Sequence, residues 1–227
     1  MDPLRPLPVL ALLSALLAGA AAAMPAVPVP PDGLRLADGR ELALPGLVLD
    51  ARTCAGPFDI EPGPVRGEDR HGRLLAAARL AGDGDLVRHL VETGCALVDP
   101  TVLPRRLAER LLFVERQAER RRRGLWRDPP VEDAARLRED GLRFALVEGR
   151  VRHVGRTGSY VYLDFGKDRR RDLSLRLEPA VQKELFADGA KPADLVGHRV
   201  RARGWILRQN GPMIHVTTVL QLEIAPP

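Results

Sequence analysis

The chain has 227 residues, which is enough for one or two domains. Hydrophobic residues make up 45% and charged residues 29%, a balance that excludes a disordered chain and indicates a packed globular protein. The formal net charge is +5, and it is unevenly placed. Residues 141–227 hold 15 Lys and Arg against 9 Asp and Glu, whereas residues 32–140 hold 19 against 20. This basic C-terminal part fits polyanion binding and fits an ordinary solvated surface equally well.

The N-terminus has the pattern of an export signal. Arg5 precedes the apolar run "LPVLALLSALLAGAAAAMPA", which predicts a signal peptide over residues 1–23. The run is too short and too rich in alanine to predict a stable membrane span in the mature chain, and an uncleaved anchor is the alternative. We therefore expect an exported protein, either periplasmic or secreted. Residues 24–31, "MPAVPVPP", predict a proline-rich extended linker.

Two cysteines, Cys54 and Cys95, are present. Export would permit a disulfide between them, but the apolar surroundings of Cys95 favour a buried free thiol. Neither spacing indicates a metal site.

A first domain is predicted over residues 32–128. Alternation of apolar and polar residues around the turn "ADGR" predicts a β-hairpin over residues 33–47. Strands are expected at residues 57–63, 73–80 and 95–99. Asp85 is placed to cap a short helix that Gly94 ends, and apolar spacing predicts a longer amphipathic helix over residues 103–126.

The polar stretch 129–140, with Pro129 and Pro130, predicts a linker. Beyond it, residues 141–227 show the order strand, strand, strand, helix, strand, strand. That order predicts a five-stranded barrel of the oligonucleotide-binding type. We expect Trp205 to pack in its core.

One strand of this second barrel suggests a binding surface. In "SYVYLDFG", Tyr160 and Tyr162 share the face opposite to Val161, Leu163 and Phe165. Outward tyrosines with basic neighbours suit stacking on single-stranded nucleic acid. The candidate basic residues are Arg150, Arg152, Arg156, Arg169, Arg170 and Arg171. The alternative is that the tyrosines cover the sheet and bind nothing.

The segments "DRHGRLLAAARLAGDGDLVRHLVETGCALV" and "LLFVERQAERRRRGLW" resemble the staphylococcal-nuclease-like (thermonuclease) family, and "GLRLADGRELALPGL" resembles its first hairpin. The resemblance covers about residues 32–126. Because that family's domain is itself a five-stranded barrel with helices, the fold expected is mainly β with α, as two tandem barrels.

This resemblance implies cleavage of phosphodiester bonds with Ca²⁺, held by carboxylates, while two arginines neutralise the phosphate. Arg73 matches one of these arginines. Asp32 and Asp50 match the metal carboxylates, Asp50 only with a short insertion. Ala43 stands where the other arginine is expected, and Thr53 stands where the catalytic glutamate is expected.

Three interpretations remain open. The first is an exported, catalytically impaired nuclease relative that binds nucleic acid, single-stranded by preference, or another polyanion. The second is an active Ca²⁺-dependent nuclease. The third is a non-enzymatic envelope scaffold that binds a protein partner.

Overall fold

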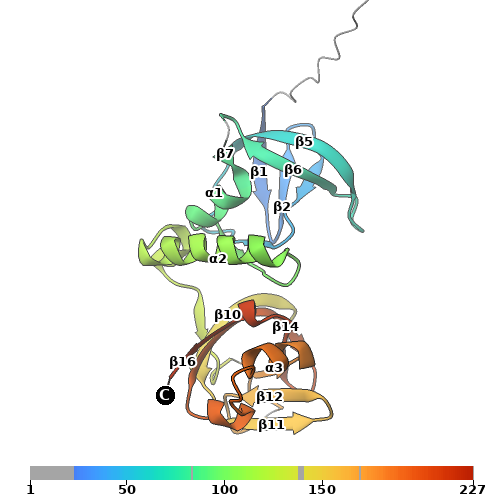
Figure 1. Ribbon diagram of the computed structural model, residues 1–227. Coiled ribbons are helices and arrows are strands. Elements are labelled where there is room, and N and C mark those ends of the chain that lie inside the picture. Colours follow the sequence, from blue (N-terminus) through green and yellow to red (C-terminus); the bar gives the residue numbers. More distant parts are fainter. Residues whose placement is uncertain (1–22, 83, 138–140, 169, 227) are drawn as a thin grey trace, which may run out of the picture.

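The computed structural model describes residues 23–82, 84–137, 141–168 and 170–226. The predicted signal peptide therefore lies, up to residue 22, outside the described part of the chain. Two β-rich domains follow one another, and a long helix runs between them (Figure 1). The fold class expected from the sequence, mainly β with α and two successive barrel-like sheets, is confirmed.

The first domain is built on a closed five-stranded barrel. Hydrogen bonds join its strands in the order β3-β2-β1-β5-β6, and a parallel contact between Leu42 and Leu74 pairs β3 with β6 and closes the barrel. These strands are β1 (Met24–Val29), β2 (Gly33–Leu36), β3 (Glu41–Ala43), β5 (Phe58–Glu68) and β6 (Leu74–Leu80), and the two-residue β7 (Gly84–Asp85) extends the sheet. Leu34, Leu42 and Ile60 point inward and are fully buried, as the alternating pattern of the hairpin requires.

The segment predicted as a proline-rich linker is a strand of the barrel. Ala26–Val29 pair with β2, and Met24–Ala26 pair with β5. Each proline of β1 therefore pairs with a strand on one side only. On its other side there is no strand among the described residues, so the absence of an N–H group costs no hydrogen bond there. The prediction of a linker over residues 24–31 is wrong, because residues 24–29 pair with β2 and β5.

Two α-helices, a 3-10 helix and a small second sheet cover one side of the first barrel. They are α1 (Leu86–Glu92), α2 (Arg105–Arg120), the 3-10 helix η1 (Gly124–Arg127) and the two-stranded sheet of β4 (Leu47–Leu49) with β8 (Ala96–Val98). Asp85 caps α1 as predicted, because its carboxylate accepts the backbone N–H of Arg88 at 3.0 Å. Leu86 and Leu90 face the barrel and are fully buried.

A disulfide joins Cys54, in the short connection between β4 and β5, to Cys95, just beyond α1. The expectation of a free thiol at Cys95 is therefore wrong. Both side chains are buried, so the apolar surroundings that favoured a thiol also suit a buried disulfide. Between β4 and β5 the chain has no helix, only a turn and the bonded cysteine.

The second domain is a sheet curled around its own core. Its strands run in the order β11-β12-β13-β15-β14-β10-β9, and β13 pairs with β15 in parallel. They are β9 (Val131–Asp133), β10 (Arg143–Arg150), β11 (His153–Thr157), β12 (Tyr160–Asp164), β13 (Ser174–Leu177), β14 (Arg199–Arg208), β15 (Pro212–Val216) and β16 (Leu222–Ala225), which pairs with β14. Because β10 and β11 are consecutive segments of one bent chain, the sheet curls back on itself, as the predicted barrel order requires. Helix α3 (Pro179–Leu185) and the 3-10 helices η2 (Pro192–Leu195) and η3 (Val219–Gln221) complete it.

The predicted linker at residues 129–140 also carries structure. Val131–Asp133 form β9, which pairs with β10, and Ala134 and Leu137 are buried in the second core. Apolar residues spaced between charges gave this segment enough buried surface to join the sheet. Residues 138–140 lie outside the described part.

A buried ion pair connects the two domains. Glu115 of α2 accepts a hydrogen bond from Arg203 of β14 at 2.6 Å, and both side chains are almost fully buried. The second carboxylate oxygen of Glu115 accepts the backbone N–H of Val98 at 2.7 Å, so the buried charge is well satisfied. A small apolar cluster that includes Trp126 and Leu146 packs beside it.

Trp205 also connects the two domains. Its Nε1 donates to Asp99 Oδ2 of the first domain at 3.0 Å, and the ring of Phe144 contacts the indole edge to face, with centroids 5.8 Å apart. The expectation that Trp205 packs in the core of the second barrel is therefore wrong, since the indole is only partly buried and contacts the other domain.

Within the described part of the chain, no helix combines the length and the apolar content that crossing a bilayer requires.

Candidate functional site

The tip of the β5–β6 hairpin carries the arginine that the sequence singled out. Asp69 begins the turn, and its Oδ1 accepts the backbone N–H groups of His71 at 2.8 Å and Arg73 at 3.0 Å. Gly72 occupies the left-handed region with φ of 74°, which a glycine adopts without strain. The motif "DRHGR" therefore forms a tight turn that places Arg73 at the start of β6.

Arg73 makes its strongest contacts with two carboxylates. Its Nε donates to Asp69 Oδ2 at 2.7 Å, and its two terminal nitrogens donate to the carboxylate of Asp32 at 2.6 and 3.1 Å. Only 18% of the Arg73 side chain is exposed. Desolvation opposes ionisation of Asp69, but the hydrogen bonds from Arg73 and His71 prevail and lower its pKa to about 2. The hydrogen bond to Asp32 raises the pKa of Arg73.

This pairing changes what the predicted clamp can do. A phosphate that approached Arg73 would have to replace Asp32 or Asp69 as its partner. The sequence predicted Asp32 as a metal ligand and Arg73 as a phosphate clamp, and the structure brings the two side chains together as an ion pair.

Asp50, the second predicted metal ligand, organises a local turn. Its Oδ1 accepts the backbone N–H of Arg52 at 2.9 Å and that of Thr53 at 3.0 Å, and its Oδ2 accepts from the Arg52 guanidinium at 3.2 Å. Burial opposes the shift, yet these donors lower the pKa of Asp50. The hydroxyl of Thr53, which stands at the expected glutamate position, donates to Asp50 and to the carbonyl of Gly94.

These residues do not fit a Ca²⁺ site. In the described ranges, no three His, Cys, Asp or Glu side chains gather closely enough to ligate one ion. Calcium requires six to eight oxygen ligands, and here Asp32 is engaged by Arg73 while Asp50 is engaged by its own turn. Ala43, at the place of the second arginine, is a buried residue of β3 that contributes no charge.

The second candidate site is the outer face of the second barrel. As predicted from their alternation, Val161, Leu163 and Phe165 are buried, and Tyr160 and Tyr162 lie partly exposed on the other face. Arg176 of β13 lies opposite Tyr162 in the sheet, and its guanidinium stacks over the Tyr160 ring at 4.6 Å from the centroid. Arg176 was not among the basic residues predicted from the sequence, although alternation with the buried Leu175 and Leu177 places it on the face of the tyrosines.

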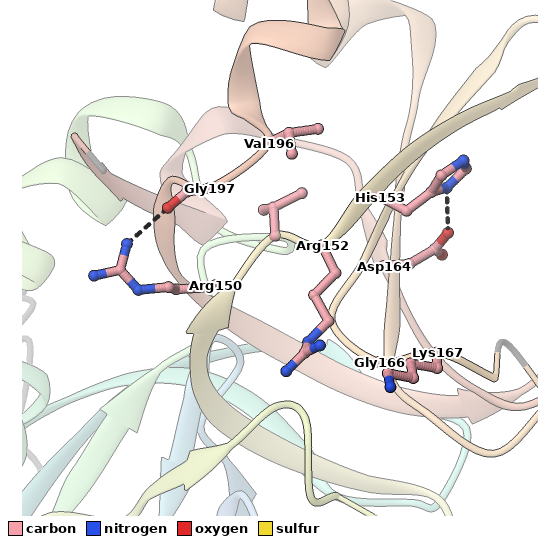
Figure 2. Close-up of a pocket in the computed structure, with 9 residues that line it drawn as sticks. Arg150, Arg152, His153, Asp164, Gly166, Lys167, Val196 and Gly197 are labelled. Carbon is pink, nitrogen blue, oxygen red and sulfur yellow. Dashed lines mark hydrogen bonds and ion pairs between the residues drawn. The ribbon is translucent and has the colours of Figure 1, made fainter.

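The predicted basic residues do not form one continuous strip. Arg150 and Arg152 line an open pocket of about 710 Å³ together with His153, Asp164 and Lys167 (Figure 2). Arg150 donates to the carbonyl of Gly197 at 2.9 Å, which fixes its direction. Asp164, almost fully buried, accepts from Ser174 at 2.8 Å and pairs with His153 at 3.0 Å.

The remaining basic candidates lie elsewhere on the domain. Arg156 of β11 donates to Gln182 of α3 at 3.3 Å. Arg170 and Arg171 are exposed in the loop between β12 and β13, and Arg169 lies outside the described residues. The basic candidates are thus distributed among the pocket of Arg152, the neighbourhood of α3 and the loop of Arg171.

Comparison with known families agrees with the architecture of the first domain. Residues 51–128 match the family model described as "Staphylococcal nuclease homologue". The first domain is therefore a staphylococcal-nuclease-like domain. The match includes Arg73, but it begins after Asp32 and Asp50 and covers less than half of the chain. No curated protein matches the sequence.

Proposed function

We propose that this protein is a nuclease relative that binds single-stranded nucleic acid through its second barrel and cleaves it poorly, if at all. The observation that carries the proposal is the cluster of Tyr160, Arg176 and Tyr162 on the outer face of that barrel. The Arg176 guanidinium covers one face of the Tyr160 ring and pairs with Glu178 at 2.8 Å, and the partly exposed Tyr162 ring next to it offers a stacking surface to an unpaired base. Exposed arginines elsewhere on the domain offer contacts to phosphates.

Poor cleavage is inferred from the geometry of the first domain. Arg73 and Asp32 neutralise each other, and Ala43 and Thr53 supply neither the second arginine nor the glutamate. Loss of one preorganised group of this kind costs about 10²- to 10³-fold in rate. Several such losses in one site leave little catalysis, although their effects do not add simply.

Export belongs to the same proposal. The disulfide supports it, because such bonds persist in oxidising compartments and are rare in the cytosol. A chain beginning near Ala23, recovered from a periplasmic or secreted fraction, is the result that export predicts.

The central experiment measures binding and cleavage side by side on a labelled single-stranded oligonucleotide. We expect the affinity to fall about 10³-fold between about 50 and 200 mM salt, the loss typical of about six phosphate contacts. Tyr162→Ala should weaken binding about tenfold, because one base loses its stacking partner, and Tyr162→Phe should keep it. Cleavage with Ca²⁺ should stay close to the level seen with chelator.

Other outcomes would favour the other interpretations. Rapid Ca²⁺-dependent cleavage that Arg73→Ala abolishes would identify an active nuclease. If the protein neither binds nor cleaves the oligonucleotide, the proposal is contradicted, and a scaffold that recognises a protein is favoured.

A further inference from the structure

The open pocket drawn in Figure 2 is lined, among the described residues, by the second domain alone. It forms where the chain bends between β10 and β11, and backbone hydrogen bonds hold its walls. The N–H of Arg152 donates to the carbonyl of Asp164 at 2.8 Å, and the N–H of Gly197 donates to the carbonyl of Val151 at 2.9 Å. These bonds attach the bend to the end of β12 and to the segment after η2, so the concave shape exists before any ligand enters.

Two cations of this pocket are available to an anion. Arg152 and Lys167 are exposed, and within the described ranges neither side chain has a carboxylate partner. Figure 2 shows that they extend toward the same side of the pocket, whereas Arg150 turns away and donates to the carbonyl of Gly197. A guanidinium or an ammonium group without an acidic partner keeps its donors for an oxyanion.

Asp164 is the one carboxylate among the described residues that line the pocket, and both of its oxygens have partners in the barrel. Its side chain is only 4% exposed. Oδ1 accepts the hydroxyl of Ser174 at 2.8 Å, and Oδ2 pairs with Nδ1 of His153 at 3.0 Å. Because these partners draw the carboxylate inward, it repels an incoming anion less than an exposed carboxylate would. The pocket therefore presents a net positive surface.

The pocket lies next to the stacking surface of the barrel. Tyr162 and Asp164 are two residues apart on β12, so their side chains leave the same face of the strand roughly 6–7 Å apart. That distance is close to the step between neighbouring phosphates in an extended single strand. A strand whose base stacks on Tyr162 can therefore place its adjacent phosphate in the pocket.

The two available cations match the charge of a phosphate at a strand end. An internal phosphodiester carries one negative charge, whereas a phosphate monoester carries about −1.5 to −2 at pH 7 and has three strong acceptor oxygens. We propose that this pocket binds the terminal phosphate monoester of a nucleic-acid strand through Arg152 and Lys167, while the adjoining base stacks on Tyr162. The inference rests on the proposed nucleic-acid function and gives the second barrel a preference for phosphorylated strand ends.

The test compares three single-stranded oligonucleotides of one sequence. One has a 5′-phosphate, one has a 3′-phosphate, and one has hydroxyl groups at both ends; each carries an internal fluorophore for anisotropy measurements with the full chain. We expect one phosphorylated end to bind about tenfold more tightly than the hydroxyl-ended strand, the value of one charge-assisted hydrogen bond. Inorganic phosphate, added at constant ionic strength, should remove this gain and leave binding of the hydroxyl-ended strand unchanged.

The variants are judged by the ratio of the two affinities, because a general loss of positive charge weakens both oligonucleotides alike. Arg152→Ala and Lys167→Ala should each lower the ratio, and the double variant should bring it close to one. Lys183→Ala removes an exposed lysine of α3 that does not line the pocket, so this matched control should leave the ratio unchanged. Tyr162→Ala should weaken binding of both oligonucleotides and keep the ratio.

The outcomes separate this inference from the proposed function. Equal affinities for the three oligonucleotides would overturn the inference and leave the proposed function standing. A preference for a phosphorylated end that survives in the double variant would overturn the assignment to this pocket. Calorimetric titration with inorganic phosphate identifies a free anion as the ligand: phosphate binding without binding of any oligonucleotide would overturn both the strand-end assignment and the proposed function.

Discussion

The guanidinium of Arg73 hydrogen-bonds two carboxylates, Asp32 and Asp69, and this double contact sets the electrostatics of the hairpin tip. A planar guanidinium has five donors in a fixed fork, so one arginine can satisfy both acids at once. The same chemistry that would grip a phosphate is here used within the protein. Arg73 is therefore held at the hairpin tip by contacts within the protein.

The lowered pKa of Asp69 predicts a pH-dependent contribution to stability. The pKa of this carboxyl is about 2 in the folded protein, below the unfolded value of about 3.9. Its contribution is therefore fully present above the unfolded value and is lost as the pH falls toward 2. Asp69→Asn should lower the free energy of unfolding at pH 7. The difference in free energy of unfolding between this variant and the unsubstituted protein should become smaller as the pH falls from about 4 to 2.

Urea unfolding at a series of pH values measures this difference. Glu68→Gln, the adjacent exposed carboxylate, is the control and should produce a small difference that does not vary with pH in this window. If the difference in free energy of unfolding for Asp69→Asn stays constant down to pH 2, the ion pair of Asp69 with Arg73 contributes nothing to stability.

Among the elements, the connection between β4 and β5 depends on a covalent bond. This connection consists of a short turn and the Cys54–Cys95 disulfide. The disulfide, together with the hydrogen bond from Thr53 to Gly94, attaches this connection to the end of α1. A covalent bond thus supplies part of the support that a packed helix would give.

Removing this disulfide should lower the stability of the first domain substantially. The bond closes a loop between cysteines 41 residues apart, and the chain-entropy estimate for such a loop is about 4 kcal/mol. We expect Cys54→Ser with Cys95→Ser to lose up to about that amount, and a reductant to reproduce the loss in the unsubstituted protein. Denaturant unfolding gives the value, and an unchanged midpoint in both cases would contradict the structural role.

How far the elements could be predicted depended on their sequence signals. The hairpin of β2 and β3, the capped helix α1 and the strand order of the second domain have clear alternation or capping patterns. Strand β1 has none, because its prolines argue against a strand unless the pairing on each side is known. In the candidate sites, alternation would have revealed Arg176. The contact of Trp205 with Asp99 joins residues far apart in sequence, and only the docking of the two domains creates it.

At the scale of the whole molecule, the buried pair of Glu115 and Arg203 makes the two domains interdependent. Each charge has lost most of its hydration and finds its closest partner in the other domain. The exposed pair of Arg105 with Glu184 also crosses between the domains, but water screens it. This connection holds the contact of Trp205 with Asp99 in place, since the two residues come from different domains.

Glu115→Ala should therefore lower the free energy of unfolding by about 3–5 kcal/mol, because it removes the closest counter-charge of the buried Arg203 and leaves only the half-exposed Glu223 at 3.8 Å. The combination of Glu115→Leu with Arg203→Met should cost much less, since apolar groups of similar size replace both charges. Calorimetry should show one unfolding transition for the unsubstituted protein and two for Glu115→Ala. Glu184→Ala is the control, and it should keep a single transition. Two transitions already present in the unsubstituted protein would disprove the coupling.

Two glycines of the first domain, Gly94 and Gly124, form a close contact between backbone segments. The backbone of Gly94, at the end of α1, touches that of Gly124, and a Cβ on either residue would come within 2.2 Å of a carbonyl oxygen of the other segment. Leu125 donates to the Gly94 carbonyl at 2.8 Å across the same contact. Any side chain here would force the two segments apart. Substitution at either glycine should therefore destabilise the first domain by disturbing the packing of the end of α1 against η1. The requirement for glycine at these two positions comes from the packing of the domain and is independent of any chemistry at the hairpin tip.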